Sequence, residues 1–432
     1  MISRSFLQTA AVVAVGNGAV ALLGIVALRV YTELAPADVY GAANLILAAL
    51  ALGFQLLVHP VVATQLRYHT EAAQAGGGEE LTRQSLHWAL AASAAQAVLA
   101  AVGLAVWQVW GHGSVGAPLV LAVAASILVA APRYVFLARL HAEQHMRAYM
   151  AMRVIEAALT VLATASALWL ATRTEAFLWG QIVAILGVLL GIWMVAPWPT
   201  WQHLVPSGSE PPAASDFRDR LVGYGAPFVP MALLYWVANL ADRYVLAGML
   251  GTAAAGQYFA AFAIASSAFS IAIGTMGDLF RPKLFDAENA GEPDRAQRIF
   301  LAWLGTYAGI SLCGLLAIWL LGPWIVALIL AKSYRDGAVT IMLWVALGYA
   351  FNGFAVACEN RMLSLGRSGR LLWPLAAGAA ANVALSFLLV SWYGIVGAAK
   401  ANCLSFGLQL LLTALFLYRL LQQRNRRAAP AV

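Results

Sequence analysis

Long stretches without any Asp, Glu, Lys or Arg restrict how this chain can fold. The longest, from Gln84 to Pro132, holds 49 residues. A helix that crosses a bilayer needs about 20 apolar residues. Lipid offers no hydrogen-bond partner to backbone N–H and C=O groups, so such stretches must be helical. Only 10% of all residues are charged, whereas soluble domains carry roughly 25%. The sequence therefore predicts an all-α integral membrane protein.

We expect twelve transmembrane helices from the positions of these stretches. The longest stretch splits around Gly111-His112-Gly113 into two helices. The predicted spans are 9–31, 42–64, 85–109, 117–139, 150–172, 176–197, 222–250, 253–277, 299–321, 338–363, 370–392 and 394–418.

The same order of residues occurs twice along the chain. In each copy an apolar helix ends near an arginine, a turn runs to a glycine, and a second apolar span ends at another arginine. The first copy is Arg29, Gly41 and Arg67, and the second is Arg243, Gly256 and Arg281. Internal repeats of this kind are typical of transporters. Six spans per half bring both halves into the membrane from the same side, which predicts a parallel repeat.

A proline-rich segment divides the predicted helices into two sets of six. We expect an N-terminal lobe at 1–200, a cytoplasmic linker at 201–220, a C-terminal lobe at 221–418 and a basic cytoplasmic tail at 419–432. Two such six-helix lobes are expected to enclose a central cleft and to rock between inward and outward openings.

The distribution of Lys and Arg predicts the orientation. With the N-terminus inside, 20 of the 26 basic residues fall in cytoplasmic segments and four at outer ends. The positive-inside rule then places both termini in the cytoplasm. The net charge is +7, and we expect the basic residues to contact membrane lipid headgroups and not nucleic acid. Cys313, Cys358 and Cys403 have unrelated spacings and predict no disulfide or metal site.

Ionisable residues inside a span cost about 2.5–3.5 kcal/mol each, so they mark candidate functional positions. Asp242 and Arg243 lie late in the seventh span, and Tyr235 and Asn239 precede them at helical spacing. We assign this polar stripe to the cleft. The alternative is a structural ion pair between helices. Pro227 and Pro230 open the same span and are expected to bend it.

Further candidates lie in other spans. Lys400 either faces the cleft or reaches back to the outer interface. Arg29 either anchors the first span or, because it is repeat-related to Arg243, presents a second cation to the cleft. Polar side chains that either line the cleft or only join helices are Asn382 and Asn402. Candidates for a gate or an interfacial salt bridge are Glu359 and Arg361.

Three stretches, 28–45, 223–260 and 377–405, carry loose motifs: a proline entry, an Asp-Arg pair, a Gly-x-Tyr turn and a Gly-x-x-Gly-Ala-Ala turn. Here the chain resembles the polysaccharide-transporter branch of the multidrug/oligosaccharidyl-lipid/polysaccharide flippase superfamily. The matching positions are Pro227, Asp242, Arg243, Gly256, Tyr258, Gly394, Gly397 and Ala398. The chain departs from the family pattern at 36–41, where Leu-Gly-Pro is commoner, and at Lys400, where an apolar residue is expected.

The resemblance implies a flippase that moves an undecaprenyl-pyrophosphate-linked oligosaccharide to the outer leaflet by alternating access. It implies a multi-pass protein of the bacterial plasma membrane, with glycosyltransferases or a polymerase as neighbours. We expect no cofactor, and we expect a monomer because the cleft lies within one chain. A pyrophosphate that crosses an apolar core needs compensating cations. Arg243, Arg29 and Lys400 are the candidates for that role.

Two other functions stay open. The first is an ion-coupled exporter of small molecules on the same fold, which would need acidic groups deep in a lobe. The second is a membrane glycan polymerase or ligase, which the short predicted outer loops disfavour. The sequence contains no Walker motif, zinc signature or Ser–His–Asp spacing. An enzymatic activity is therefore not expected.

Overall fold

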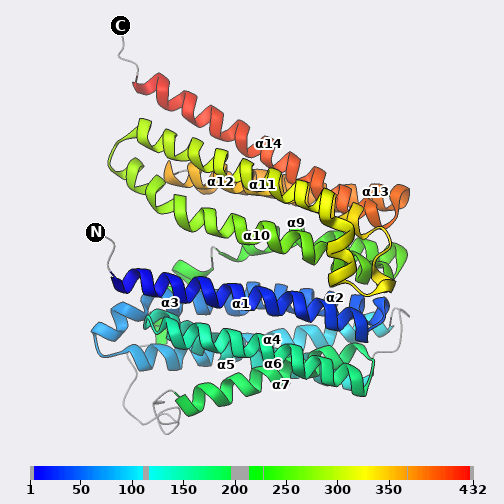
Figure 1. Ribbon diagram of the computed structural model, residues 1–432. Helices are drawn as coiled ribbons and strands as arrows, with labels where there is room; N and C mark the ends of the chain where they lie inside the picture. Colours follow the sequence, from blue (N-terminus) through cyan, green and yellow to red (C-terminus); the bar gives the residue numbers. More distant parts are fainter. Residues whose placement is uncertain (1–3, 110–115, 196–213, 227, 367, 429–432) are drawn as a thin grey trace. The chain divides into compact units, whose positions relative to one another are not determined.

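The computed structural model describes all residues except 1–3, 110–115, 196–213, 227, 367 and 429–432 (Figure 1). In the described residues, eleven helices are long and apolar enough to cross a membrane. A twelfth span results if the segments Phe217–Gly225 and Val229–Leu250, which meet at a bend, are counted as one. This agrees with the prediction of an all-α membrane protein with twelve spans. The predicted turn at 111–113, most of the predicted linker and Pro227 lie outside the described residues.

The chain forms two compact units. The first contains Met1–Ala35 and Ala43–Leu233, and the second contains Pro36–Ala42 and Leu234–Val432. The second unit thus includes a short piece of the N-terminal half of the sequence. The chain also passes from the first unit to the second between Leu233 and Leu234, within the helix that follows the predicted linker.

The first unit is a bundle of helices, most of them apolar. Its helices are α1 (Arg4–Leu34), α2 (Ala37–Gly53), a π-helix (Phe54–Val58), α3 (His59–Gln74), α4 (Gly78–Val109), α5 (Ala117–Ala142), α6 (Met146–Leu170), α7 (Thr174–Val195), α8 (Ala214–Arg220) and a second π-helix (Leu221–Gly225). Helix α6 packs against α1 and α7, and α4 packs against α5. Helices α2 and α3 and the π-helix between them form one continuous span, Ala37–Gln74.

The second unit is built around α12 (Ala338–Ser364), which packs against α10, α11 and α14. Its other helices are α9 (Phe228–Leu250), which begins in the first unit, α10 (Thr252–Asn289), α11 (Pro293–Ile329), α13 (Leu372–Tyr393) and α14 (Ile395–Ala428). Short 3₁₀ turns lie at Lys332–Tyr334 and Ser368–Leu371. Figure 1 shows α12 and α14 running alongside one another, and α14 carries the chain to its C-terminal end.

Two helices of the second unit are much longer than the spans predicted for them. Helix α10 has 38 residues and α11 has 37, where 253–277 and 299–321 were expected. At 1.5 Å per residue, each is about 56 Å long, well beyond the hydrocarbon thickness of about 30 Å. Hydropathy detects only the part of a helix that lies in lipid. The polar ends can continue as helix outside the lipid, because the hydrogen bonds within a helix do not depend on the surrounding lipid.

The duplicated glycines contact one another inside the second unit. A Cβ atom on Gly41 would lie 2.7 Å from the backbone nitrogen of Gly256, and even closer to the Thr252 carbonyl oxygen. Conversely, a Cβ on Gly256 would meet the carbonyl group of Ala37. Ala37 and Thr252 are related by the same offset of 215 residues as Gly41 and Gly256. The contact is therefore reciprocal, as expected where two repeats meet on their local two-fold axis.

This contact also corrects an expectation about local structure. Gly41 and Gly256 were expected to close turns, but both lie about one turn inside helices, α2 and α10. Their lack of a side chain serves close helix packing, as small residues do in membrane helices. Beside them the ring of Tyr40 packs edge-on against Tyr334 of the second unit, with centroids 5.9 Å apart. Burial raises the pKa of the Tyr334 hydroxyl, which therefore stays neutral.

Candidate functional site

A tight hairpin between α9 and α10 brings Asp242 to Tyr258. The two helices are joined at Gly251, whose φ of +89° is a conformation that favours glycine. Asp242 lies nine residues before this turn and Tyr258 seven after it, so the two side chains meet. The Tyr258 hydroxyl donates a 2.6 Å hydrogen bond to Asp242 Oδ2. Both residues are fully buried, and Oδ1 of Asp242 has no hydrogen-bond partner in the described structure.

Arg243 points into the same helix pair but has different neighbours. Its guanidinium carbon lies 4.1 Å from the ring centroid of Phe262 and 4.7 Å from that of Phe259, both on α10. Only 6% of the residue is exposed. Cation–π contacts with a desolvated arginine contribute about 2 kcal/mol, which offsets part of the cost of burial. Among the described residues, Nε of Arg243 has no hydrogen-bond partner. The arginine is thus buried within the second unit and does not face lipid.

The Tyr258→Phe substitution tests the bond to Asp242. Removing the hydroxyl leaves a buried carboxylate without its donor, and hydrogen bonds to charged groups contribute about 1.5–3 kcal/mol. We expect a loss of about 2 kcal/mol in thermal unfolding of the purified protein in detergent. The matched control is Tyr307→Phe, because Tyr307 donates to a neutral carbonyl, that of Tyr349. Equal losses in the two variants would show that the charge of Asp242 adds nothing to its bond.

Glu359 lies on α12 and is held by neutral donors. The hydroxyl of Tyr235 on α9 donates to Oε2 at 3.1 Å, and the amide of Gln409 on α14 donates to Oε1 at 3.0 Å. The residue is 8% exposed. Within the described part of the chain Glu359 forms no salt bridge, since these two partners carry no charge, and its role in a gate remains a prediction. Asn239, the other member of the predicted stripe, donates to the backbone oxygen of Tyr235 at 2.8 Å.

Arg361, two residues further along α12, belongs to a separate ionic cluster. It forms an ion pair with Glu288 near the end of α10, and Arg424 on α14 contacts the same carboxylate at 2.8 Å. The side chain of Arg361 is 2% exposed and that of Glu288 is 8% exposed. The cluster joins three helices of the second unit. Arg361 was predicted from the sequence as a candidate, but its partner Glu288 was not, because Glu288 lies outside the predicted spans.

A line of amides and hydroxyls joins α13 to α14. Asn382 donates to the hydroxyl of Ser405 at 3.3 Å, and Ser405 donates to the backbone of Asn402. All three residues are almost completely buried. In the described structure, both polar side-chain atoms of Asn402 lack a partner. The predicted polar stripe therefore does join helices, and it also retains unused hydrogen-bonding capacity.

The two remaining cations have local partners. Arg29, in the first unit, forms a 2.9 Å ion pair with Glu33 one turn later, and its side chain is 40% exposed. The amine of Lys400 lies 3.3 Å from the ring centroid of Tyr393 at the end of α13, and 5.7 Å from that of Trp344. Both contacts accord with anchoring at a helix end. The assignment of these cations to a substrate remains a prediction.

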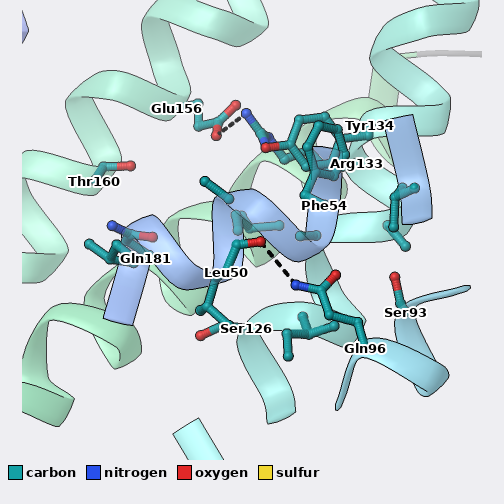
Figure 2. Close-up of a pocket in the computed structure, with 17 residues that line it drawn as sticks. Leu50, Phe54, Ser93, Gln96, Ser126, Arg133, Tyr134, Glu156, Thr160 and Gln181 are labelled. Carbon is teal, nitrogen blue, oxygen red and sulfur yellow. Dashed lines mark hydrogen bonds and ion pairs between the residues drawn. The ribbon is translucent and has the colours of Figure 1, made fainter. Parts of the chain in front are cut away.

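A cavity of about 370 Å³ lies inside the first unit, at a place that the sequence did not indicate (Figure 2). Helices α2, α4, α5, α6 and α7 and the first π-helix contribute its walls. Arg133 and Glu156 form a 2.7 Å ion pair on one side of it. The polar residues that line it are Ser93, Gln96, Ser126, Arg133, Tyr134, Glu156, Thr160 and Gln181.

Local irregularities of the helices shape this cavity. Pro132 lies inside α5 just before Arg133, and a proline in a helix interior removes one backbone hydrogen bond. On the facing wall, the π-helix Phe54–Val58 interrupts the span, and such segments are frequent at functional sites. Gln96 donates to the carbonyl of Leu50 one turn before it, at 2.9 Å. The signals available in the sequence were Pro132 and the charged pair within predicted spans.

No cluster of three or more His, Cys, Asp or Glu side chains suited to a metal ion occurs among the described residues. The buried or partly buried ionisable groups described above, Asp242, Glu359, Arg361 and Glu156, instead take part in ion pairs or hydrogen bonds.

Comparison with known proteins identifies the family. A family model described as polysaccharide biosynthesis protein matches residues 84–339, which is more than half of the chain. The chain belongs to this family. A search of curated proteins finds no matching sequence.

Solved structures show that this family member has the fold of the MOP superfamily. A multidrug resistance MATE family transporter in an inward-facing conformation has a TM-score of 0.76 at 13% identity, covering 95% of this chain and 96% of that one. A MOP superfamily transporter from Pyrococcus furiosus has a TM-score of 0.66 at 12% identity, covering 96% and 94%. The lipid II flippase MurJ has a TM-score of 0.67 at 12% identity, covering 94% and 87%. The fold expected from the sequence is confirmed.

Proposed function

We propose that this protein is a flippase that moves an undecaprenyl-pyrophosphate-linked oligosaccharide from the cytoplasmic to the outer leaflet of a bacterial plasma membrane. It acts by alternating access as a monomer, with both termini in the cytoplasm, and supplies surface polysaccharide synthesis. The observation that carries the proposal is the family match over more than half of the chain, on a fold that it shares with the lipid II flippase MurJ.

The charged groups of the second unit support this substrate class. A pyrophosphate in an apolar core needs cationic partners, and arginine binds phosphate oxygens in a bidentate manner. Arg243 is a buried cation whose described contacts are aromatic rings, so hydrogen-bonding capacity of its guanidinium remains available for an anion. Asp242, held by Tyr258, limits the net positive charge and hence the tightness of binding.

The Arg243→Ala substitution tests this role. In a strain that depends on this protein, we expect lipid-linked oligosaccharide to accumulate and surface polysaccharide to fall at least about tenfold, the effect of losing about 1.4 kcal/mol of phosphate binding. The measurement is the ratio of lipid-linked to surface glycan at equal protein levels. Unchanged surface glycan would remove Arg243 from the mechanism.

The matched control is Arg295→Ala. Arg295 is an exposed arginine in the same unit, paired with Glu292 at 2.9 Å. Its loss removes the same charge without touching a buried position, so transport is expected to stay unchanged. The variant Arg243→Lys keeps the charge but not the planar donor group. Transport by this variant at the wild-type rate would show that charge alone suffices.

An ion-coupled exporter of small molecules on the same fold is a second candidate. The observation that favours it is Glu359, a buried carboxylate whose partners Tyr235 and Gln409 are neutral. Such a carboxylate can take up a proton or a cation without displacing a basic side chain. If cells that express the protein gain resistance to toxic cationic compounds, and lose it on Glu359→Gln without any change in surface glycan, the exporter function is supported and the flippase is not.

A further inference from the structure

The cavity in the first unit combines a charge-compensated pair with free polar groups. Arg133 Nη2 lies 2.7 Å from Glu156 Oε1, and the guanidinium carbon lies 4.3 Å from the ring centroid of Tyr134. The two formal charges cancel within the lining. An anion placed beside Arg133 would also meet the carboxylate of Glu156. The cavity therefore disfavours a phosphate or pyrophosphate group.

Several polar side chains of the lining are not engaged by the protein. Among the described residues, the side chains of Ser93, Thr160 and Gln181 make no hydrogen bond, whereas Gln96 is bonded to the Leu50 carbonyl. Figure 2 shows Gln181 and Thr160 on one side of the cavity and Gln96 and Ser93 on another. A purely apolar ligand would displace water from these groups and offer no hydrogen bonds in return. The cost is about 1–3 kcal/mol for each group.

The rest of the lining is apolar and partly aromatic. Phe54 and Tyr134 stack with centroids 3.9 Å apart, and aliphatic side chains such as Leu47, Ile127 and Ile185 complete the wall. A ligand that suits this cavity therefore needs apolar ring faces together with hydroxyl or amide groups along its edge. A sugar ring has this combination, with axial C–H groups on its faces and hydroxyls around it.

We propose that this first-unit cavity binds one uncharged sugar ring of the lipid-linked headgroup, with Gln181, Gln96 and Thr160 bonding its hydroxyls. The proposal rests on the proposed function, and it assigns the sugar to the first unit while the cation Arg243 belongs to the second. The open polar groups on several helices select a hydroxylated ring, and the compensated Arg133–Glu156 pair supplies both a donor and an acceptor.

Protection of a cysteine in the cavity tests the proposal on the purified, full-length protein. Cys313, Cys358 and Cys403 are replaced by alanine, and Thr160→Cys is introduced into this background. Its reaction with a small, water-soluble methanethiosulfonate is timed alone and with free hexoses, N-acetylhexosamines or 6-deoxyhexoses. We expect at least one of these sugars to slow the reaction at least about tenfold at saturation, because an occupied cavity excludes the reagent.

Two controls make the result specific. Thr172→Cys places the thiol at the exposed end of α6, outside the cavity lining, so no sugar should protect it. In the Thr160→Cys background, Gln181→Leu removes one amide from the cavity and should weaken protection about tenfold. Gln84→Leu is the matched amide loss outside the cavity, where Gln84 bonds Glu80, and should leave protection unchanged.

Two kinds of outcome overturn the proposal. Protection by inorganic pyrophosphate but by no sugar would assign the cavity to an anion. A lack of protection by every sugar, or a Thr160→Cys that does not react at all, would exclude a sugar site there. These results leave the flippase function intact, because they do not measure transport. A protein that binds sugar in this assay but does not alter the distribution of lipid-linked glycan would instead refute the proposed function; the sugar site in the cavity would stand, but its assignment to a lipid-linked headgroup would fall.

Discussion

Replacing Gly256 by alanine is expected to prevent stable folding of the second unit. The new methyl group would lie 2.9 Å from the carbonyl carbon of Ala37 and closer still to its oxygen. These are backbone atoms on a neighbouring helix, so no side-chain rotation can relieve the overlap. Overpacking costs typically 1–3 kcal/mol, and more where the backbone must move. We expect a loss of about 3 kcal/mol or more.

The measurement is the thermal midpoint of the detergent-purified protein, or its yield as a monodisperse species. Gly274→Ala is the matched control, because Gly274 lies on the same helix and nothing lies within 4 Å of an added Cβ. Alanine favours helices by about 1 kcal/mol over glycine, so this control should be neutral or stabilising. If Gly256→Ala behaved like Gly274→Ala, the close contact between the two repeats would be wrong.

Removing the carboxylate of Glu288 is expected to destabilise the second unit by about 3–5 kcal/mol, the typical cost of breaking a buried ion pair. Glu288→Ala leaves Arg361 with a charge that is 2% exposed and has lost its ionic partner. Arg424, at 34% exposure, can turn towards solvent, so most of the cost falls on Arg361. The measurement is again thermal unfolding in detergent.

A nearby glutamate gives the control for this prediction. Glu292 pairs with Arg295 at 2.9 Å, but both side chains are about half exposed. Exposed pairs contribute about 0–1 kcal/mol, so Glu292→Ala should have little effect. The double variant Glu288→Leu with Arg361→Met should recover stability relative to Glu288→Ala, since no buried unpaired charge remains and Arg424 can reach solvent. A failure to recover would show that geometry, not charge, dominates this cluster.

The fold could be predicted from the sequence because its strongest signals, the charge-free stretches and the repeat, extend over many residues. Charge-free stretches determine which segments can lie in lipid. The 215-residue offset between Gly41 and Gly256 indicates a repeat, and the structure brings these two glycines into contact. The lengths of α10 and α11 were underestimated, because a helix that leaves the membrane no longer has an apolar sequence.

The site was less predictable than the fold. Asp242 and Arg243 stand out as charges inside an apolar span. Which side chains contact them, however, depends on the backbone conformation of the hairpin at Gly251. The cavity beside Arg133 and Glu156 depends on a π-helix and an internal proline acting together across different helices. No local pattern encodes that combination.

The seven residues Pro36–Ala42 have a consequence for how the chain can be divided. They leave the first unit after Ala35, pack with the second, and return at Ala43, so the polypeptide passes between the units at three places. If the gene were split between its halves, this segment would be part of the N-terminal fragment, although it packs with the C-terminal one. The C-terminal fragment alone would then expose the surface around Thr252 and Gly256, and reassembly of co-expressed fragments would require the N-terminal piece to donate it.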